Sequence, residues 1–185
     1  SYIGLAVAKT PIGPFKDQGV VVKTNPEICH HNAIDANVVT DKVGKQWLLY
    51  GSFFGGLYIL PLNKKTGKPS ESGFGRRVAM RPQSVDTAIE GGFIYYNPDT
   101  DYYYLFCSYD SLNDSYNIRV ARSHHIDGPY IDCKGFAMDD FTHHPDEIGV
   151  KVLGSYQFSG EKMVLAPGHN SIFKRSDNQL FMVHH

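Results

Sequence analysis

The chain has 185 residues, of which 42% are hydrophobic and 20% are charged, and these proportions fit a globular domain with a core of its own. Eighteen basic and nineteen acidic residues give a net charge of −1, so the composition excludes the strongly basic surface that binds nucleic acid or an anionic membrane. We therefore expect a neutral partner.

The three cysteines, Cys29, Cys107 and Cys133, are too few and too widely spaced for a zinc ribbon or a disulfide scaffold. One disulfide bridge remains possible, but free buried thiols are the favoured state. No apolar run reaches the roughly 18 residues that a membrane span needs.

Both ends of the chain lie inside strand-like sequence. Residues 3–8 already predict a strand, and residues 181–185 fall within another. The sequence has no initiating Met and no signal peptide. We therefore expect an internal segment of a longer protein, and the lack of a leader says nothing about where that protein works.

Strand patterns alternate with turns along the whole chain. The predicted strands are, in order, 3–8, 20–22, 38–39, 46–52, 55–62, 93–96, 102–109, 117–122, 172–173 and 179–184. Residues 64–68 predict a solvated hairpin turn, and residues 139–149 predict a long loop. No stretch keeps a helical spacing of apolar residues for three turns, so the predicted fold is all-β.

Two patterns repeat along the chain. A strand and a basic residue followed by Gly-Pro-aromatic occur at residues 13–15 and again at 128–130. A longer unit combines a polar residue, a short strand, a polar turn and an aromatic-rich strand, and it begins at Asp35, at Glu90 and at His169. Such spacing is typical of β-propeller blades of about four strands, with an insertion in the last unit.

The first strand of each propeller blade lines the central channel, so equivalent residues of successive blades converge there. We therefore expect Asp35, Glu90 and His169 to meet in one cavity. Two carboxyl groups across an aromatic-walled pocket suit glycoside hydrolysis, where one of them gives a proton to the leaving oxygen. A lone acid at a strand start is more often a turn or hydrogen-bonding residue, but the repeated position favours a catalytic role.

Five motifs, in order, resemble those of glycoside hydrolase family 43, and most closely its endo-α-1,5-L-arabinanases. They are Asn-Ala-Ile-Asp at 32–35, Tyr-Gly-Ser-Phe-Phe-Gly-Gly-Leu at 50–57, Ala-Ile-Glu-Gly at 88–91, Arg-Val-Ala-Arg-Ser at 119–123 with Gly-Pro-Tyr at 128–130, and Gly-His-Asn-Ser at 168–171. The resemblance implies a five-bladed β-propeller. Residues 1–185 would then form an incomplete catalytic domain, from the end of blade 2 to the start of blade 5.

The resemblance also implies an inverting enzyme that cleaves α-1,5-L-arabinan internally with three acids. Glu90 matches the general acid, and Asp35 matches the acid that tunes the pKa of the general acid and orients the substrate. The general base of the family lies early in the first blade, and no Asp of this chain matches it. We expect the base outside this segment, roughly 6.5–9.5 Å from Glu90, and the segment alone to be inactive.

Phe53 and Phe54 follow a strand in a glycine-flanked loop, where one ring could stack on a pentose. Adjacent residues of an extended chain face opposite ways, so packing explains at least one ring. We expect Phe54 to bind substrate, with Asn32 and Ser52 as polar contacts.

His169 resembles the axial histidine of the family, which helps to hold a calcium ion at the channel centre. Calcium prefers oxygen ligands, so the imidazole would be one contact among waters. The alternative is a histidine that only forms hydrogen bonds in the channel. The other eight histidines form adjacent pairs at 30–31, 124–125, 143–144 and 184–185, and each pair makes a poor chelate because neighbouring side chains diverge.

Two other functions remain open. One is an exo-acting α-L-arabinofuranosidase or β-xylosidase of the same family, in which loops close one end of the groove. The other is a carbohydrate-binding propeller without a base. We expect arabinan or an arabino-oligosaccharide as partner, together with the N-terminal part of the propeller, and neither nucleic acid nor a membrane. By resemblance, the protein is secreted or lies in the bacterial cell envelope and degrades plant cell-wall polysaccharide.

Overall fold

A computed structural model describes residues 1–82, 87–140, 142, 147–157, 159–160 and 162–185. Every regular element in these residues is a β-strand, as the sequence predicted. The strands are β1 (Tyr2–Val7), β2 (Lys16–Lys23), β3 (Asn37–Thr40), β4 (Gln46–Tyr50), β5 (Leu57–Asn63), β6 (Lys68–Pro69), β7 (Arg76–Ala79), β8 (Ile89–Asn97), β9 (Tyr102–Tyr109), β10 (Asn117–Ser123), β11 (Val150–Leu153), β12 (Ser171–Lys174) and β13 (Leu180–Val183).

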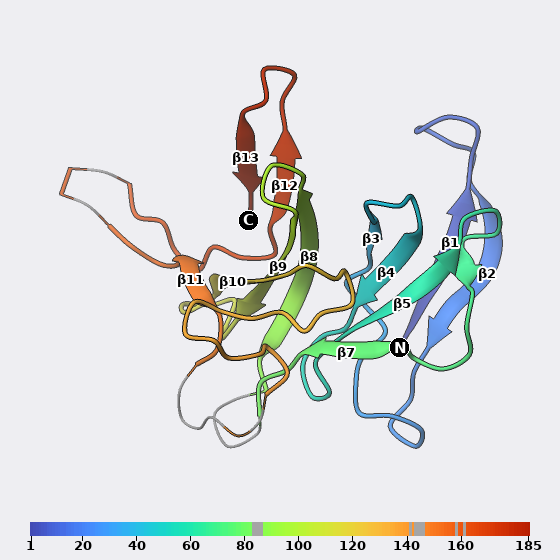
Figure 1. Cartoon of the computed structure of the whole chain (residues 1–185), viewed down its shortest axis with the longest axis horizontal. Helices are drawn as coiled ribbons and strands as arrows, with labels where there is room; N and C mark the ends of the chain where they lie inside the picture. The colour runs from blue at the N-terminus through green and yellow to red at the C-terminus, as the bar shows by residue number, and fades with distance from the viewer. Residues whose placement is uncertain (83–86, 141, 143–146, 158, 161) are drawn as a thin grey trace.

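The strands form four antiparallel sheets that follow one another along the chain (Figure 1). β1 pairs with β2, and β12 pairs with β13. The second sheet has the order β3-β4-β5-β6, with β7 also paired to β5, and the third has the order β8-β9-β10-β11. The three repeated units of the sequence therefore open three different sheets, at β3, β8 and β12.

Short polar turns reverse the chain between neighbouring strands. The carboxylate of Asp41 accepts hydrogen bonds from the backbone N–H groups of Val43 and Lys45, at 3.0 and 2.9 Å. It also accepts one from the indole of Trp47 at 2.9 Å. The side chain of Asp41 thus stabilises the turn and links it to the next strand. Asp often forms such hydrogen bonds to the backbone at turns.

The main core lies between the second and third sheets, because β8 packs against β3, β4 and β5. In β9, alternate side chains point into this core, as the two-residue period of a strand requires. The buried cluster includes Leu49, Leu57, Ile59, Ile94, Tyr103, Leu105, Cys107 and Tyr109. This packing fixes β8, and with it the position of Glu90, against the neighbouring sheet.

Some elements differ from their predictions. β6, β7 and β11 were not predicted. Lys68 of β6 falls within the predicted hairpin turn at 64–68, and Arg76–Ala79 and Val150–Leu153 are not flanked by the aromatic strands and turns that marked the repeated units. Asp35, which opens the first repeated unit, precedes β3 and has a φ of 56°. Part of the predicted loop at 139–149 and the histidine pair at 143–144 lie outside the described residues.

All three cysteines are free thiols. Cys107 is fully buried, and this burial raises its pKa to about 12. The prediction of buried thiols is wrong for Cys133, which is exposed, and Cys29 is only partly buried. In the described part of the chain, no helix is long and apolar enough to cross a membrane.

Candidate active site

Three residues from the starts of three sheets meet around Gly91. The carboxylate of Asp35 accepts a hydrogen bond through Oδ2 from the N–H of Gly91, at 3.2 Å, and Gly91 directly follows Glu90. A Cβ at Gly91 would lie 3.1 Å from both Cα and Cγ of His169. Gly91 has a φ of 60°, so a glycine supplies both the backbone conformation and the space that this meeting needs.

The carboxyl group of Glu90 is held at both oxygens. The hydroxyl of Ser52, just beyond β4, lies 3.0 Å from Oε2, and the phenol of Tyr116, just before β10, lies 3.1 Å from Oε1. Both hydroxyls act as donors to the carboxylate, and hydrogen bonds to a charged group are the strong ones. Two sheets therefore cooperate to orient one partly buried acid.

Tyr116 was missed in the sequence, where its only signal is an aromatic side chain in an otherwise polar loop. It is fully buried, and its ring stacks on His185 with the centroids 5.4 Å apart. Burial, together with the negative charges of Glu90 and Asp35, raises the pKa of its phenol against the opposing effect of a hydrogen bond with Ser108. The phenol therefore keeps its proton at any physiological pH.

Ser108 was also missed in the sequence. It is buried at the end of β9, opposite Glu90 in the register, and its hydroxyl accepts a hydrogen bond from the backbone N–H of His169 at 2.8 Å. A small hydroxyl at the end of an aromatic strand is the only signal that the sequence offers. Ser108 thus links the strand beside Glu90 to the segment that carries His169.

The backbone around the site holds several non-glycine residues in the left-handed region. Asp35, Phe53, Phe54 and His169 have φ values of 56°, 54°, 36° and 46°. Such conformations cost free energy, and they persist where the surrounding structure enforces them, often at functional sites. Four other non-glycine residues, Asp101, Asp110, Ala166 and Asn178, share this backbone region, so the conformation is not confined to the site.

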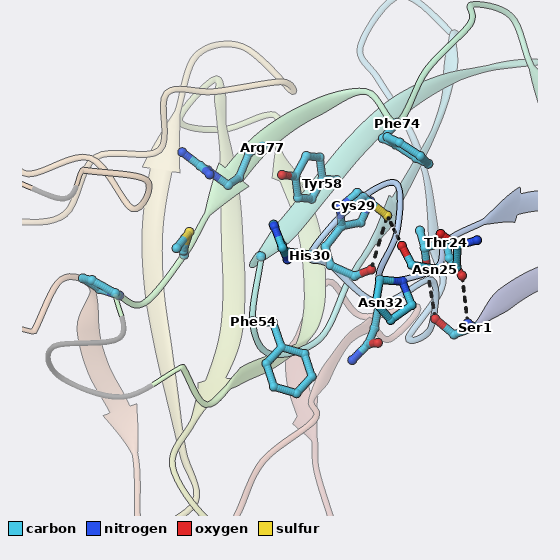
Figure 2. Close-up of a pocket in the computed structure, with 15 residues that line it drawn as sticks. Ser1, Thr24, Asn25, Cys29, His30, Asn32, Phe54, Tyr58, Phe74 and Arg77 are labelled. Carbon is cyan, nitrogen blue, oxygen red and sulfur yellow. Dashed lines mark hydrogen bonds between the residues drawn. The ribbon is translucent and has the colours of Figure 1, made fainter.

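A cavity of about 870 Å³ opens beside the loop that carries Phe54 (Figure 2), and neither Asp35, Glu90 nor His169 is among its lining residues. Its lining includes Asn25, His30, Asn32, Phe54, Tyr58 and Phe74. Phe54 is 58% exposed, so its ring is accessible from the cavity. The lining combines aromatic faces with amide and imidazole groups, which is the usual composition of a pocket for a small polar ligand.

The predicted polar contacts lie in different places. Asn32 lines the cavity, and its amide donates a hydrogen bond to the carbonyl of Ser52 at 3.0 Å. Ser52 is only 2% exposed and turns its hydroxyl to Glu90. The backbone N–H of Phe53 donates to the carbonyl of Ile89 at 2.7 Å, so the loop that carries Phe54 is tied to β8 one residue before Glu90.

His169 is exposed, and its neighbour Asn170 is 2% exposed. Neither the nitrogen nor the oxygen of the Asn170 amide has a hydrogen-bond partner, and a buried amide in this state usually marks a place for water or an ion. No group of three or more His, Cys, Asp or Glu side chains in the described residues could hold a metal ion. The unpartnered amide of Asn170 could hold a water molecule, including one that belongs to the water shell of an ion.

A buried ionic network supports the start of β8. The guanidinium of Arg81 donates to the carbonyl of Ala88 at 3.1 Å, to Asp110 at 2.7 Å and to Glu147 at 3.0 Å. Glu147 also pairs with Arg119. Because Ala88 lies two residues before Glu90, Arg81 fixes the entry of the chain into the acid-bearing strand.

Glu90 is oriented by two hydroxyls, and the carboxylate of Asp35 is bound to the backbone of the next residue. A pair of carboxyl groups held in this way is what glycoside hydrolysis requires. The profile of Glycosyl hydrolases family 43 matches residues 1–185, and the chain belongs to this family. The resemblance of the five motifs is thereby confirmed.

Two curated relatives and one crystal structure show the range of similar proteins. The chain is 40% identical to extracellular endo-alpha-(1->5)-L-arabinanase 2 of Bacillus subtilis (strain 168), over 94% of this chain and 42% of that protein. It is 31% identical to extracellular exo-alpha-(1->5)-L-arabinofuranosidase ArbA of Cellvibrio japonicus (strain Ueda107), over 100% of this chain and 54% of that protein.

The crystal structure of endo-1,5-alpha-L-arabinanase from Thermotoga petrophila RKU-1 superimposes with a TM-score of 0.87 and 34% identity. The superposition covers 99% of this chain and 46% of that chain. The chain thus spans about half the length of the relatives that it matches.

Proposed function

We propose that the protein containing this chain is an inverting glycoside hydrolase that cleaves α-1,5-L-arabinan internally, with Glu90 as the general acid. The observation that carries this proposal is the pair of hydrogen bonds from Ser52 and Tyr116 to the two oxygens of Glu90. A general acid has to be held in one orientation to reach the leaving oxygen. The arabinanases among the relatives support arabinan as the substrate.

The hydroxyl partners suit an acid that changes its charge during the reaction. A hydroxyl group can donate or accept a hydrogen bond, so Ser52 and Tyr116 can hold Glu90 both before and after it gives its proton to the leaving sugar. The raised pKa of Tyr116 keeps a proton available for the carboxylate that forms. Both residues are therefore proposed as direct partners of the general acid.

Asp35 is proposed to orient the substrate, together with the tuning role that the family resemblance implies. Its Oδ2 is bound to the N–H of Gly91, which fixes the carboxylate beside Glu90. The other oxygen, Oδ1, can accept a hydrogen bond from a sugar hydroxyl. Phe54 and Asn32 are proposed to contact the sugar in the cavity that they line.

The general base is proposed to come from a part of the protein outside residues 1–185, across a five-bladed β-propeller. The four consecutive antiparallel sheets support this architecture, with the chain running from the end of blade 2 to the start of blade 5. On this view, hydrolysis requires the full-length protein.

His169 is proposed to contribute one ligand to a calcium ion at the centre of the propeller, with water as the other ligands and Asn170 as a hydrogen-bond partner of that water. Calcium would supply positive charge and rigidity next to the two acids. The relatives named extracellular support a protein that acts outside the cell, on plant cell-wall arabinan.

A second function is exo-acting release of arabinose, and the exo-acting relative that covers the whole chain favours it. Incubation of the full-length protein with linear α-1,5-arabinan separates the alternatives. A ladder of oligosaccharides supports internal cleavage, arabinose alone supports exo action, and binding without products supports a carbohydrate-binding propeller. Proton NMR of the first product should show the inverted, β-configured anomer; retention would overturn the inverting mechanism.

A further inference from the structure

His30 and His31 differ sharply although they are adjacent. Both line the cavity, but the side chain of His31 is only 5% exposed. Its ring stacks on Tyr58 with the centroids 3.9 Å apart and meets the edge of Phe74 at 5.0 Å. His31 is therefore a part of the cavity wall, and the proposed reaction makes no use of it.

The hydrogen bonds of Tyr50 determine which nitrogen of His31 carries the proton. The phenol of Tyr50 donates its single proton to the carbonyl of Phe74 at 2.8 Å. It can then only accept from Nε2 of His31, which lies 3.1 Å away. Nε2 of His31 therefore carries a proton, and because burial lowers the pKa of His31, the neutral imidazole with its proton on Nε2 is favoured.

The loop that carries Phe54 rests on His31. A Cβ at Gly55 would lie 2.8 Å from Cβ of His31 and 2.9 Å from its backbone nitrogen, so the two segments touch with no room for a side chain between them. Asn32 follows His31 in the chain, and its side-chain amide donates a hydrogen bond to the carbonyl of Ser52. One histidine thereby supports both proposed sugar contacts.

We propose that His31 is a positioning residue of the cavity: its imidazole, fixed by Tyr50 and Tyr58, anchors the backbone of residues 31–32, and this backbone in turn holds the Phe54 loop and Asn32 in place for a sugar. This inference rests on the proposed function for the nature of the ligand. It assigns to His31 a structural role in substrate affinity, in place of metal binding by the adjacent pair at 30–31.

The same geometry makes the cavity sensitive to acid. Burial lowers the pKa of His31, and the titratable groups around it are Cys29, His30, Tyr50, Tyr58 and Arg77. Protonation would add a donor at Nδ1 and a second positive charge to a wall that already carries Arg77. The loop should then loosen, and substrate affinity should fall as the pH falls.

The test compares His31→Ala, His31→Gln and His124→Ala in the full-length protein with linear α-1,5-arabinan. Gln keeps an N–H donor for Tyr50 but cannot titrate. His124 is a matched control, since it stacks on Tyr102 at the same 3.9 Å, at the opposite end of β9 from Ser108.

We expect His31→Ala to raise KM by roughly two- to tenfold, the value of one lost aromatic contact, with kcat nearly unchanged. His31→Gln should keep the KM of the parent at neutral pH and lose its rise in acid. An unchanged KM in His31→Ala, or the same acid rise in His31→Gln, would overturn the inference. If His31→Ala fails to fold, the pH dependence of KM in His31→Gln is sufficient to test the inference.

Hydrogen exchange provides a readout that is independent of catalysis. The N–H groups of Phe53 and Gly56 are bound to Ile89 and Phe53, and they should exchange faster in His31→Ala but not in His124→Ala. Equal protection in all variants would overturn the inference. If the parent protein does not cleave arabinan, the proposed function fails, while this measurement still tests the role of His31.

Discussion

The hydroxyl of Ser52 lies 3.0 Å from Oε2 of Glu90, although the two residues are 38 positions apart and belong to different sheets. Tyr116 reaches the other oxygen from a third segment, 26 positions beyond Glu90. The orientation of the proposed general acid therefore depends on the packing of two sheets against each other.

Ser52→Ala and Tyr116→Phe should each lower kcat on arabinan by roughly ten- to a hundredfold, because each removes one hydrogen bond of about 1.5–3 kcal/mol to a charged group. KM should change little, since neither side chain is exposed to the cavity. Tyr104→Phe is the control, because its phenol contacts only Thr100 among the hydrogen bonds described, at the far end of the sheet. Unchanged kcat in both site variants would show that Glu90 needs no such support.

Glu90→Gln and Asp35→Asn should each reduce turnover by about two to four orders of magnitude, the usual contribution of acid–base groups. Both amides are close in size to the acids, and Asn tolerates the left-handed backbone found at Asp35. Thermal unfolding should therefore remain close to that of the parent. Near-normal turnover in either variant, measured as reducing ends released from arabinan, would remove that residue from the proposed mechanism.

The lowered pKa of His31 predicts how stability depends on pH. The unfolded chain binds a proton at His31 below pH about 6.5, while the folded chain resists it. This group therefore contributes full stability above that pH, and stability is lost as the pH falls towards the folded pKa. Thermal melts of the parent and of His31→Gln should converge in acid; parallel curves would show that His31 is not the titrating group.

Arg81→Met should destabilise the fold by about 1–3 kcal/mol, because it removes the cation from the partly buried carboxylate of Asp110, while Glu147 keeps its ion pair with Arg119. The control is Arg175→Met, whose partner Asp177 lies on the surface. That change should cost no more than about 1 kcal/mol. Urea denaturation measures the free energy of unfolding of both variants. Similar losses would show that the ion pairs of Arg81 stabilise the fold no more than a surface ion pair does.

Removal of calcium with a chelator should lower the unfolding temperature of the full-length protein, and added calcium should restore it, because a ligand that binds only the folded state stabilises it. His169→Ala should weaken calcium binding in isothermal titration, with His184→Ala as an exposed control. Equal calcium affinity in both variants would exclude His169 as a ligand.

Much of the fold could be predicted from the sequence. The alternation of aromatic strands with polar turns predicted β3, β4, β5, β9 and β10 close to their observed bounds, because strand period and turn chemistry are local properties. The predicted strand at 93–96 is only part of β8, which begins at Ile89 and so includes Glu90. β7 and β11 were not predicted. Each is stabilised by its pairing with a neighbouring strand, β5 or β10, and such pairing leaves no local pattern in the sequence. Gly13 and Gly128 of the repeated motif have φ values of 85° and 81°, so the repeat in the sequence is also a repeat in the backbone.

The sequence by itself determined the all-β class, the family and the acids at the repeated positions, because these depend on residue type and spacing along the chain. Only the tertiary structure decided that Ser52 faces Glu90 and not the cavity, that Tyr116 completes the support of the acid, and that His31 is buried beneath the Phe54 loop. Hydrogen bonds between side chains require a particular approach of separate sheets, and the packing of the core sets that approach.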